Sequence, residues 1–94
     1  MANNYDHKTL SAIWAKATAV AGYDMNALRK DICGAWITWR AYGNRESDNG
    51  WEVDHITPES KNGSDMLSNL RPLHWKNNAR KSDGSLVCAV SARG

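Results

Sequence analysis

The sequence predicts a small α+β domain in which helices from the first third of the chain pack around a strand–loop–strand–helix unit. Three patterns predict it: apolar residues at helical spacing before residue 33, apolar alternation from residue 51, and a second apolar run that leads into a basic segment after residue 70. The 94 residues suit a single domain spanning residues 1–94 and leave no room for a second independent core.

The composition is that of a water-soluble globular chain. Hydrophobic residues make up 41% of the sequence and the mean hydropathy is -0.64, which excludes the disordered and membrane classes. Five Trp and no Phe predict that a few indole rings supply much of the buried area. The first residues are polar and show no secretory leader pattern, so we expect a cytoplasmic location.

Residues 9–32 are predicted to form a helical scaffold. From Thr9 to Ala21, apolar residues recur at helical spacing, and Gly22 follows as a stop signal. The residues on the predicted inner face are Leu10, Ile13, Trp14, Ala17 and Val20. A second, shorter helix is predicted from Asn26 to Ile32, with Asn26 as its N-cap. Its predicted inward-facing residues are Met25, Leu28 and Ile32.

An apolar, aromatic stretch from Cys33 to Tyr42 comes next. Its alternation is imperfect, so we expect an extended segment that packs under the later unit, followed by a turn-rich connection over residues 43–50. Cys33 and Cys88 are far apart and show no Cys-x-x-Cys spacing. Reduced, partly buried thiols are therefore expected, with a disulfide between the two as the alternative.

Residues 50–83 carry the strand–loop–strand–helix unit. A first strand is predicted from Trp51 to Ile56, with Trp51, Val53 and His55 on one face and Asp54 on the other. Pro58 ends this strand, and a surface loop covers residues 59–68.

The second half of the unit begins with a strand predicted from Leu70 to Trp75, in which Pro72 implies an edge or a bend. A helix follows from Trp75 to Ser82, with Asp83-Gly84 as its stop. Residues 84–94 form a tail in which Leu86 to Val90 either adds a last strand or packs against the rest.

Charge is unevenly distributed over this unit. Residues 51–65 contain four acidic residues and one basic residue, whereas residues 69–83 contain four basic residues and one acidic residue. An acidic pocket beside a basic segment is typical of a cation site next to a phosphate-binding track. Without further signals, two solvated faces of different charge would be the default interpretation.

The ordered polar residues supply that further signal. The adjacent pair Asp54-His55 is followed after fourteen residues by Asn69, and Asn78 comes nine residues later. The other positions of this set are Pro58, Leu70, Leu73 and Lys81. With these residues, about a third of the chain resembles an HNH endonuclease, a family whose active site is a ββα-metal hairpin and helix. The resemblance is to a variant with Asn at the last motif position.

The resemblance implies a role for each of four residues. His55 corresponds to the general base, and an imidazole suits this task because its ordinary pKa lies near neutrality. Asp54 corresponds to a metal ligand, and Asn69 to the residue that braces the loop and orients the His. Asn78 corresponds to the second metal ligand. The alternatives are a structural, hydrogen-bonded His55 and an Asp54 that forms an ion pair with a nearby Arg.

The ligand types indicate which metal is preferred. Asp54 and Asn78 offer only oxygen atoms, which favours one Mg²⁺ or Mn²⁺ ion over Zn²⁺ or Ni²⁺. Alternation sends Asp54 and His55 to opposite faces of an ideal strand, so we expect a local twist or a strand end at this pair.

Further residues have expected supporting roles. The candidates for phosphate contact are Arg71, Lys76, Arg80 and Lys81. His74 and Asn77 stand where many members of the family carry a Cys-x-x-Cys that binds a structural zinc, so that zinc knuckle is absent. We expect these two residues to pack in the interior or to play an accessory role at the site.

The resemblance implies a metal-dependent endonuclease that hydrolyses DNA, and we expect a weakly specific nickase because no separate sequence-reading module is visible. The site chemistry does not distinguish DNA from RNA. The main alternative is a catalytically degraded nucleic-acid-binding module, motivated by the Asn at position 78, and another is a small structural protein. One site in one domain predicts a monomer or a weak homodimer.

Overall fold

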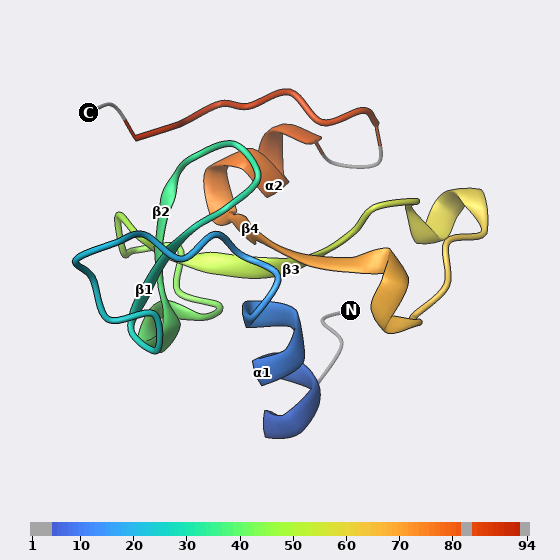
Figure 1. Cartoon of the computed structure of the whole chain (residues 1–94). Helices are drawn as coiled ribbons and strands as arrows, with labels where there is room; N and C mark the ends of the chain where they lie inside the picture. Colours follow the sequence, from blue (N-terminus) through green and yellow to red (C-terminus); the bar gives the residue numbers. More distant parts are fainter. Residues whose placement is uncertain (1–4, 82–83, 93–94) are drawn as a thin grey trace.

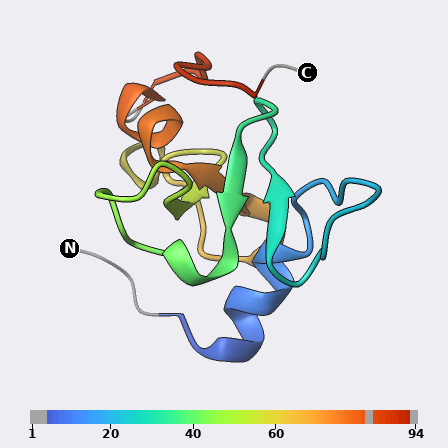
Figure 2. The same cartoon turned by 90° about the vertical axis from the view of Figure 1, so that its left-hand side faces the viewer.

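The computed structural model describes residues 5–81 and 84–92 and has two α-helices and two antiparallel two-stranded sheets (Figures 1 and 2). The elements are α1 (His7–Trp14), β1 (Leu28–Lys30), β2 (Trp36–Thr38), β3 (Trp51–His55), β4 (Leu70–His74) and α2 (Trp75–Lys81). The predicted α+β class is therefore confirmed. Both strands of the later unit and its helix lie within one residue of their predicted bounds.

The β3–β4 hairpin lies between the two helices, with α1 on one side and α2 on the other (Figure 1). Its register places Trp51 opposite His74, Asp54 opposite Arg71 and His55 opposite Leu70. Because side chains alternate along a strand, Trp51 faces the core beside α1, and Asp54 faces α2. The hairpin thus presents one apolar and one polar face.

The core is built around indole rings, as the composition predicts. Trp51 is fully buried, and Trp14 and Trp39 lie against it, with ring centroids 5.2 and 5.9 Å from that of Trp51. The other buried members of this cluster are Ile13, Ala17, Ile37 and Leu70. The cluster joins α1, β2 and the apolar face of the hairpin into one unit.

The predicted first helix is too long and begins too late. Helix α1 begins at His7, where the carboxylate of Asp6 accepts a hydrogen bond from the backbone N–H of Thr9, and it ends at Trp14 rather than Ala21. Thr18 pairs instead with Lys30 through two backbone hydrogen bonds of 2.8 and 2.9 Å. This strand-like pairing takes the backbone groups that a longer helix would need.

The predicted second helix is wrong. Leu28 to Lys30 form strand β1, which pairs with β2 in the register Leu28–Thr38 to Lys30–Trp36. Met25 and Ile32, expected to face inward, are 53% and 68% exposed. A seven-residue helix is marginal on its own, and long-range pairing with β2 outweighs it.

A buried carboxylate connects the β1–β2 hairpin to the β4–α2 junction. Asp31 is 3% exposed, and its Oδ1 accepts hydrogen bonds from the backbone N–H groups of Cys33 and Ala35. Its Oδ2 accepts from the backbone N–H of His74 and from the side-chain amide of Asn77. Four donors therefore compensate for the burial of one carboxylate.

The C-terminal segment runs across α2 and reaches the turn between β1 and β2 (Figures 1 and 2). A disulfide joins Cys33 to Cys88, so the expectation of reduced thiols is wrong. Val90 exchanges hydrogen bonds with the side chain of Asn77, and Ala92 donates to the carbonyl of Gly34. Leu86 to Val90 accordingly packs against the domain without adding a strand.

The end of α2 and the cellular location are the remaining predictions from the sequence. The helix stop predicted at Asp83 lies outside the described residues, as does Ser82. No helix in the described ranges is long and apolar enough to cross a membrane. Disulfides persist mainly in oxidising compartments, so the cytoplasmic location stays a prediction to be weighed against the Cys33–Cys88 bond.

Reduction of the disulfide should destabilise the domain. The bond closes a loop with a sequence separation of 55 residues, and its loss is expected to lower the free energy of unfolding by about 2–4 kcal/mol. Urea denaturation with and without dithiothreitol measures this, and the Cys33→Ser/Cys88→Ser variant should be insensitive to the reductant. Equal stability of the wild type in both conditions would contradict the bond.

Loss of the Asp31 carboxylate should also be costly. Asp31→Ala leaves several buried donors without an acceptor, so the free energy of unfolding should fall by about 3 kcal/mol or more. Asp24→Ala is the matched control, because Asp24 is exposed and its carboxylate accepts one local hydrogen bond from Asn26. A similar small change in both variants would show that Asp31 does not hold the junction.

Candidate functional site

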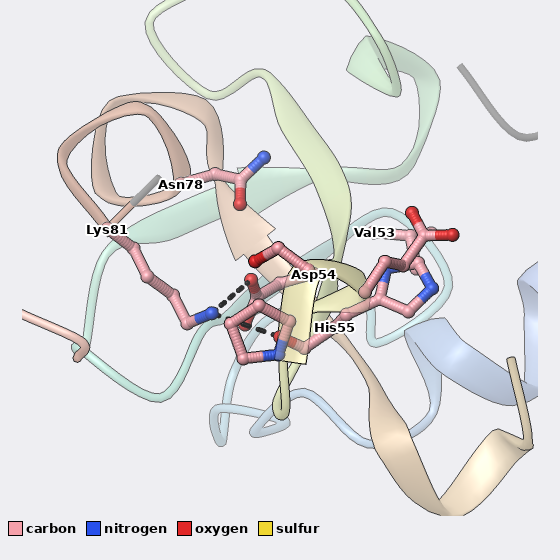
Figure 3. A pocket seen from close by; sticks show the side chains of 8 residues that line it. Val53, Asp54, His55, Asn78 and Lys81 are labelled. Atoms are coloured by element: carbon pink, nitrogen blue, oxygen red, sulfur yellow. Dashed lines mark hydrogen bonds and ion pairs between the residues drawn. The ribbon is translucent and has the colours of Figure 1, made fainter. Parts of the chain in front are cut away.

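A pocket of about 310 Å³ lies where β3, the loop after it and α2 meet (Figure 3). It is lined by Val53, Asp54, His55, Pro58, Glu59, Ser60, Asn78 and Lys81. Three of the four principal residues identified in the sequence are among them: Asp54, His55 and Asn78. Asn69 does not line the pocket, and its side chain forms hydrogen bonds with Thr57 and Ser64 of the loop.

Asp54 is buried in ion pairs. Its carboxylate is 3% exposed; Oδ2 accepts a 2.8 Å hydrogen bond from Nε of Arg71, and Oδ1 lies 3.3 Å from Nζ of Lys81. Arg71 lies directly opposite Asp54 in the hairpin, and Lys81 reaches it from α2 (Figure 3). The structure thus contains the Asp–Arg ion pair that sequence reasoning gave as the alternative role of Asp54.

His55 points to the other side of β3. Its imidazole lies away from Asn78 and Lys81 (Figure 3), and its Nε2 lies 2.7 Å from Oδ1 of Asp65 in the loop. Strand β3 ends at this residue, in agreement with the expected strand end, while its pairing with Leu70 stays regular. Both residues line the pocket, but their functional groups approach it from opposite sides of the strand.

A three-residue chain of hydrogen bonds holds Asn78. Its side-chain N–H donates to Oε1 of Glu52 at 2.8 Å, and Arg45 donates twice to the same carboxylate, at 2.7 and 2.9 Å. Partial burial raises the pKa of Glu52, but the hydrogen bonds from Arg45 and Asn78 outweigh this effect and hold the pKa below its ordinary value. Glu52 is therefore ionised at neutral pH.

Asn69 closes the loop that leads from β3 to β4. Its Oδ1 accepts a hydrogen bond from the backbone N–H of Thr57, and its Nδ2 donates to the carbonyls of Thr57 and Ser64. Gly63 lies so close to Thr57 that a Cβ would overlap the Thr57 carbonyl oxygen. The loop that carries Glu59 and Asp65 is thus fixed by Asn69. No hydrogen bond from the Asn69 side chain to His55 is among the described interactions.

His74 and Asn77 are structural in this arrangement. His74 is 3% exposed; its Nε2 donates to the carbonyl of Asp48, and its Nδ1 accepts from the backbone N–H of Lys76. Asn77 is fully buried between Asp31 and Val90. Neither residue lines the pocket.

The four candidates for phosphate contact separate into two groups. Lys76 and Arg80 are exposed and lie one turn apart on α2. Arg71 and Lys81 face inward and bind Asp54, and Lys81 also donates to the backbone carbonyl of His55. Only Lys76 and Arg80 therefore present their charge at the surface.

Two sets of atoms have the chemistry of metal ligands. The first comprises the Asp54 carboxylate and the Asn78 carbonyl oxygen, which points toward Asp54 (Figure 3). The second comprises His55, Glu59 and Asp65, whose ligand atoms lie within 4.8 Å of one another. The first set offers only oxygen and suits a hard cation, and the second adds an imidazole nitrogen.

The sequence assigns no individual site role to four residues of this region, although three of them, Glu52, Glu59 and Asp65, belong to the acidic segment in which a cation site is predicted. Glu52 and Arg45 act on Asn78, and Glu59 and Asp65 lie beside His55. Alternation does place Glu52 on the face of Asp54, which is a signal that could have identified it. Arg45, Glu59 and Asp65 belong to irregular connections, where no periodicity predicts direction.

Comparison with known proteins identifies one family. The family model described as "HNH endonuclease" matches residues 33–84, which is more than half of the chain. The match extends from the disulfide-bonded Cys33 through both strands of the β3–β4 hairpin and all of α2. No curated protein and no solved structure matches the chain.

Removal of the Asp54 carboxylate should destabilise the fold. Asp54→Ala leaves the buried ammonium of Lys81 without a counter-charge, so the free energy of unfolding should fall by about 3–5 kcal/mol. Asp65→Ala is the control, because the Asp65 side chain is 68% exposed and its loss should cost less than about 1 kcal/mol. Urea denaturation compares them, and two equally small losses would contradict the ion-pair network.

Proposed function

The chain belongs to the HNH endonuclease family, and from this premise we propose that it is a metal-dependent endonuclease that nicks DNA with little sequence specificity. The observation that carries the proposal is the shared pocket of Asp54, His55 and Asn78. An imidazole and two oxygen-bearing side chains line this one pocket, at three of the positions on which the resemblance to the family rests.

The residues fit one divalent cation held by Asp54 and Asn78. Since Nδ2 of Asn78 is bonded to Glu52, its Oδ1 is the atom left for the pocket. A carboxylate paired with two cationic side chains still has free lone-pair positions, so Asp54 can bind a cation while it stays paired with Arg71 and Lys81. Oxygen donors favour Mg²⁺ or Mn²⁺ over Zn²⁺ or Ni²⁺. When bound, the ion would stabilise the negative charge that develops on the phosphate and the leaving oxygen.

His55 is proposed as the general base. The Asp65 carboxylate accepts a hydrogen bond from Nε2–H, which leaves Nδ1 as the basic nitrogen of the neutral ring. Nδ1 then takes a proton from the attacking water as the new oxygen–phosphorus bond forms and the bond from phosphorus to the leaving 3′-oxygen breaks. The leaving oxygen takes up a proton from solvent water and becomes a hydroxyl group. Asn69 acts indirectly, because it fixes the loop that carries Asp65. A base of this kind contributes about 10²–10⁴-fold in rate.

Lys76 and Arg80 are proposed to contact the phosphates of the nucleic acid. They form an exposed positive strip on α2, the helix that also carries Asn78. Contacts of this kind position the backbone without reading the bases, which agrees with weak sequence specificity. The same contacts serve RNA, so digestion of both polymers has to be compared.

Two alternatives differ in what they predict. A catalytically degraded nucleic-acid-binding module is motivated by the Asn at position 78, and it predicts binding without cleavage. A metal site at His55, Glu59 and Asp65 is motivated by their proximity. It would occupy Nε2 of His55 and would make cleavage depend on Glu59 and Asp65 as metal ligands.

Plasmid nicking tests the proposal. Supercoiled DNA should be converted to the open circle in Mg²⁺ or Mn²⁺, and a chelator should abolish the reaction. His55→Ala should lower the rate at least about 10²-fold, whereas His7→Ala serves as a control for the loss of an exposed imidazole in α1. Cleavage that survives His55→Ala would contradict the mechanism, and binding without cleavage in any divalent metal would favour the degraded module.

A further inference from the structure

The amide of Asn78 has two ends of nearly equal size and opposite chemistry. Its oxygen can bind a cation, whereas its NH₂ group is a hydrogen-bond donor and cannot. A half-turn about the terminal bond exchanges the two ends at almost no steric cost. Whether Asn78 is a metal ligand therefore depends on a neighbour that distinguishes one end from the other.

Glu52 is that neighbour. Both oxygens of Glu52 accept hydrogen bonds from Arg45, so the carboxylate faces its neighbours as an acceptor. Its Oε1 lies 2.8 Å from Nδ2 of Asn78 and requires the NH₂ end to face it. The oxygen of Asn78 is then on the pocket side (Figure 3). The reversed amide would place its oxygen against a negatively charged oxygen, which is repulsive.

Glu52 is itself held in place. Nε and one terminal nitrogen of Arg45 bind its two oxygens at 2.7 and 2.9 Å, a paired geometry that fixes the plane of the carboxylate. The guanidinium of Arg45 lies 5.9 Å from the centre of the Trp75 ring, at the start of α2. Glu52 lies in β3, opposite Leu73. The chain of contacts therefore links the hairpin, the connection before it and the helix that carries Asn78.

We propose that Glu52 is a positioning residue which, supported by Arg45, turns the Asn78 oxygen into the pocket and so raises its affinity for a divalent cation. This inference rests on the proposed function, in which Asn78 is a metal ligand. Glu52 does not bind the ion in this scheme, because it does not line the pocket and because three hydrogen bonds, two from Arg45 and one from Asn78, occupy three of the about four lone-pair positions of its carboxylate.

Calorimetric titration with Mn²⁺, without DNA, measures the effect independently of cleavage. Glu52→Gln can present either an acceptor or a donor to Asn78, so the amide is no longer oriented, and the affinity should fall about 10-fold or more. Glu46→Gln removes the same charge from an exposed position in the neighbouring connection. It should change the affinity less than about 2-fold, because exposed charges are screened.

Two further variants separate positioning from simple attraction between charges. Glu52→Asp keeps the negative charge but withdraws it from Asn78, and it should weaken Mn²⁺ binding as Glu52→Gln does. In an Asn78→Asp background the ligand has two equivalent oxygens and needs no orientation. In that background, Glu52→Gln should change the affinity for Mn²⁺ less than about 3-fold. The effects of the two substitutions on affinity are then not additive, and a double-mutant cycle measures the difference.

The outcomes distinguish failure of the inference from failure of the proposed function. If the wild type binds no Mn²⁺, or if Asp54→Asn binds it equally well, the proposed function and the role of Glu52 are both contradicted. If Asp54→Asn loses Mn²⁺ binding but Glu52→Gln behaves like Glu46→Gln, only the role of Glu52 is contradicted. Equal losses from Glu52→Gln in the wild-type and Asn78→Asp backgrounds would also overturn it. Should Glu52→Gln fail to fold by circular dichroism, Glu52→Asp decides in the same way.

Discussion

The four hydrogen bonds accepted by the buried carboxylate of Asp31 determine how the rest of the domain fits together. They join the turn after β1 to the backbone of His74, where β4 ends and α2 is about to begin, and to the side chain of Asn77. The direction in which α2 leaves the hairpin is thereby fixed. Asn78 and Lys81 depend on that direction, because both must reach back over β3 to meet Glu52 and Asp54.

His74 and Asn77 are the residues for which the sequence resemblance implies the absence of a zinc-binding pair of cysteines. In this chain the same two residues are held by Asp31, and Asn77 also binds Val90. The disulfide between Cys33 and Cys88 fastens the same C-terminal segment from the other side. A buried hydrogen-bonded carboxylate and a disulfide therefore stabilise this region.

The polar residues around the hairpin divide according to strand alternation. Glu52 and Asp54 face α2, where they meet Asn78 and Lys81, whereas His55 faces the loop with Glu59 and Asp65. This separation keeps the imidazole away from the oxygen atoms that are proposed as metal ligands, and each group is oriented by its own hydrogen-bond partner. Lys81 connects the two sides, because it binds both the Asp54 carboxylate and the carbonyl of His55.

The β3–β4–α2 unit could be predicted closely because local patterns define it: alternation from Trp51, turn residues after His55, and a short apolar run before Trp75. The segment from Thr9 to Ile32 could not, because its helical spacing competes with the distant pairing of Thr18 with Lys30 and of β1 with β2. The disulfide and the partners of Asp54 and Asn78 likewise join residues far apart in sequence, which no spacing rule reveals.

Anomalous diffraction from a crystal of the protein grown with Mn²⁺ locates the bound ion without reference to activity. We expect one strong peak in the pocket, within about 2.0–2.3 Å of an Asp54 carboxylate oxygen and of Oδ1 of Asn78. A peak bound instead to Nε2 of His55 with Glu59 and Asp65 would contradict it, as would a crystal at millimolar Mn²⁺ with no peak in this pocket.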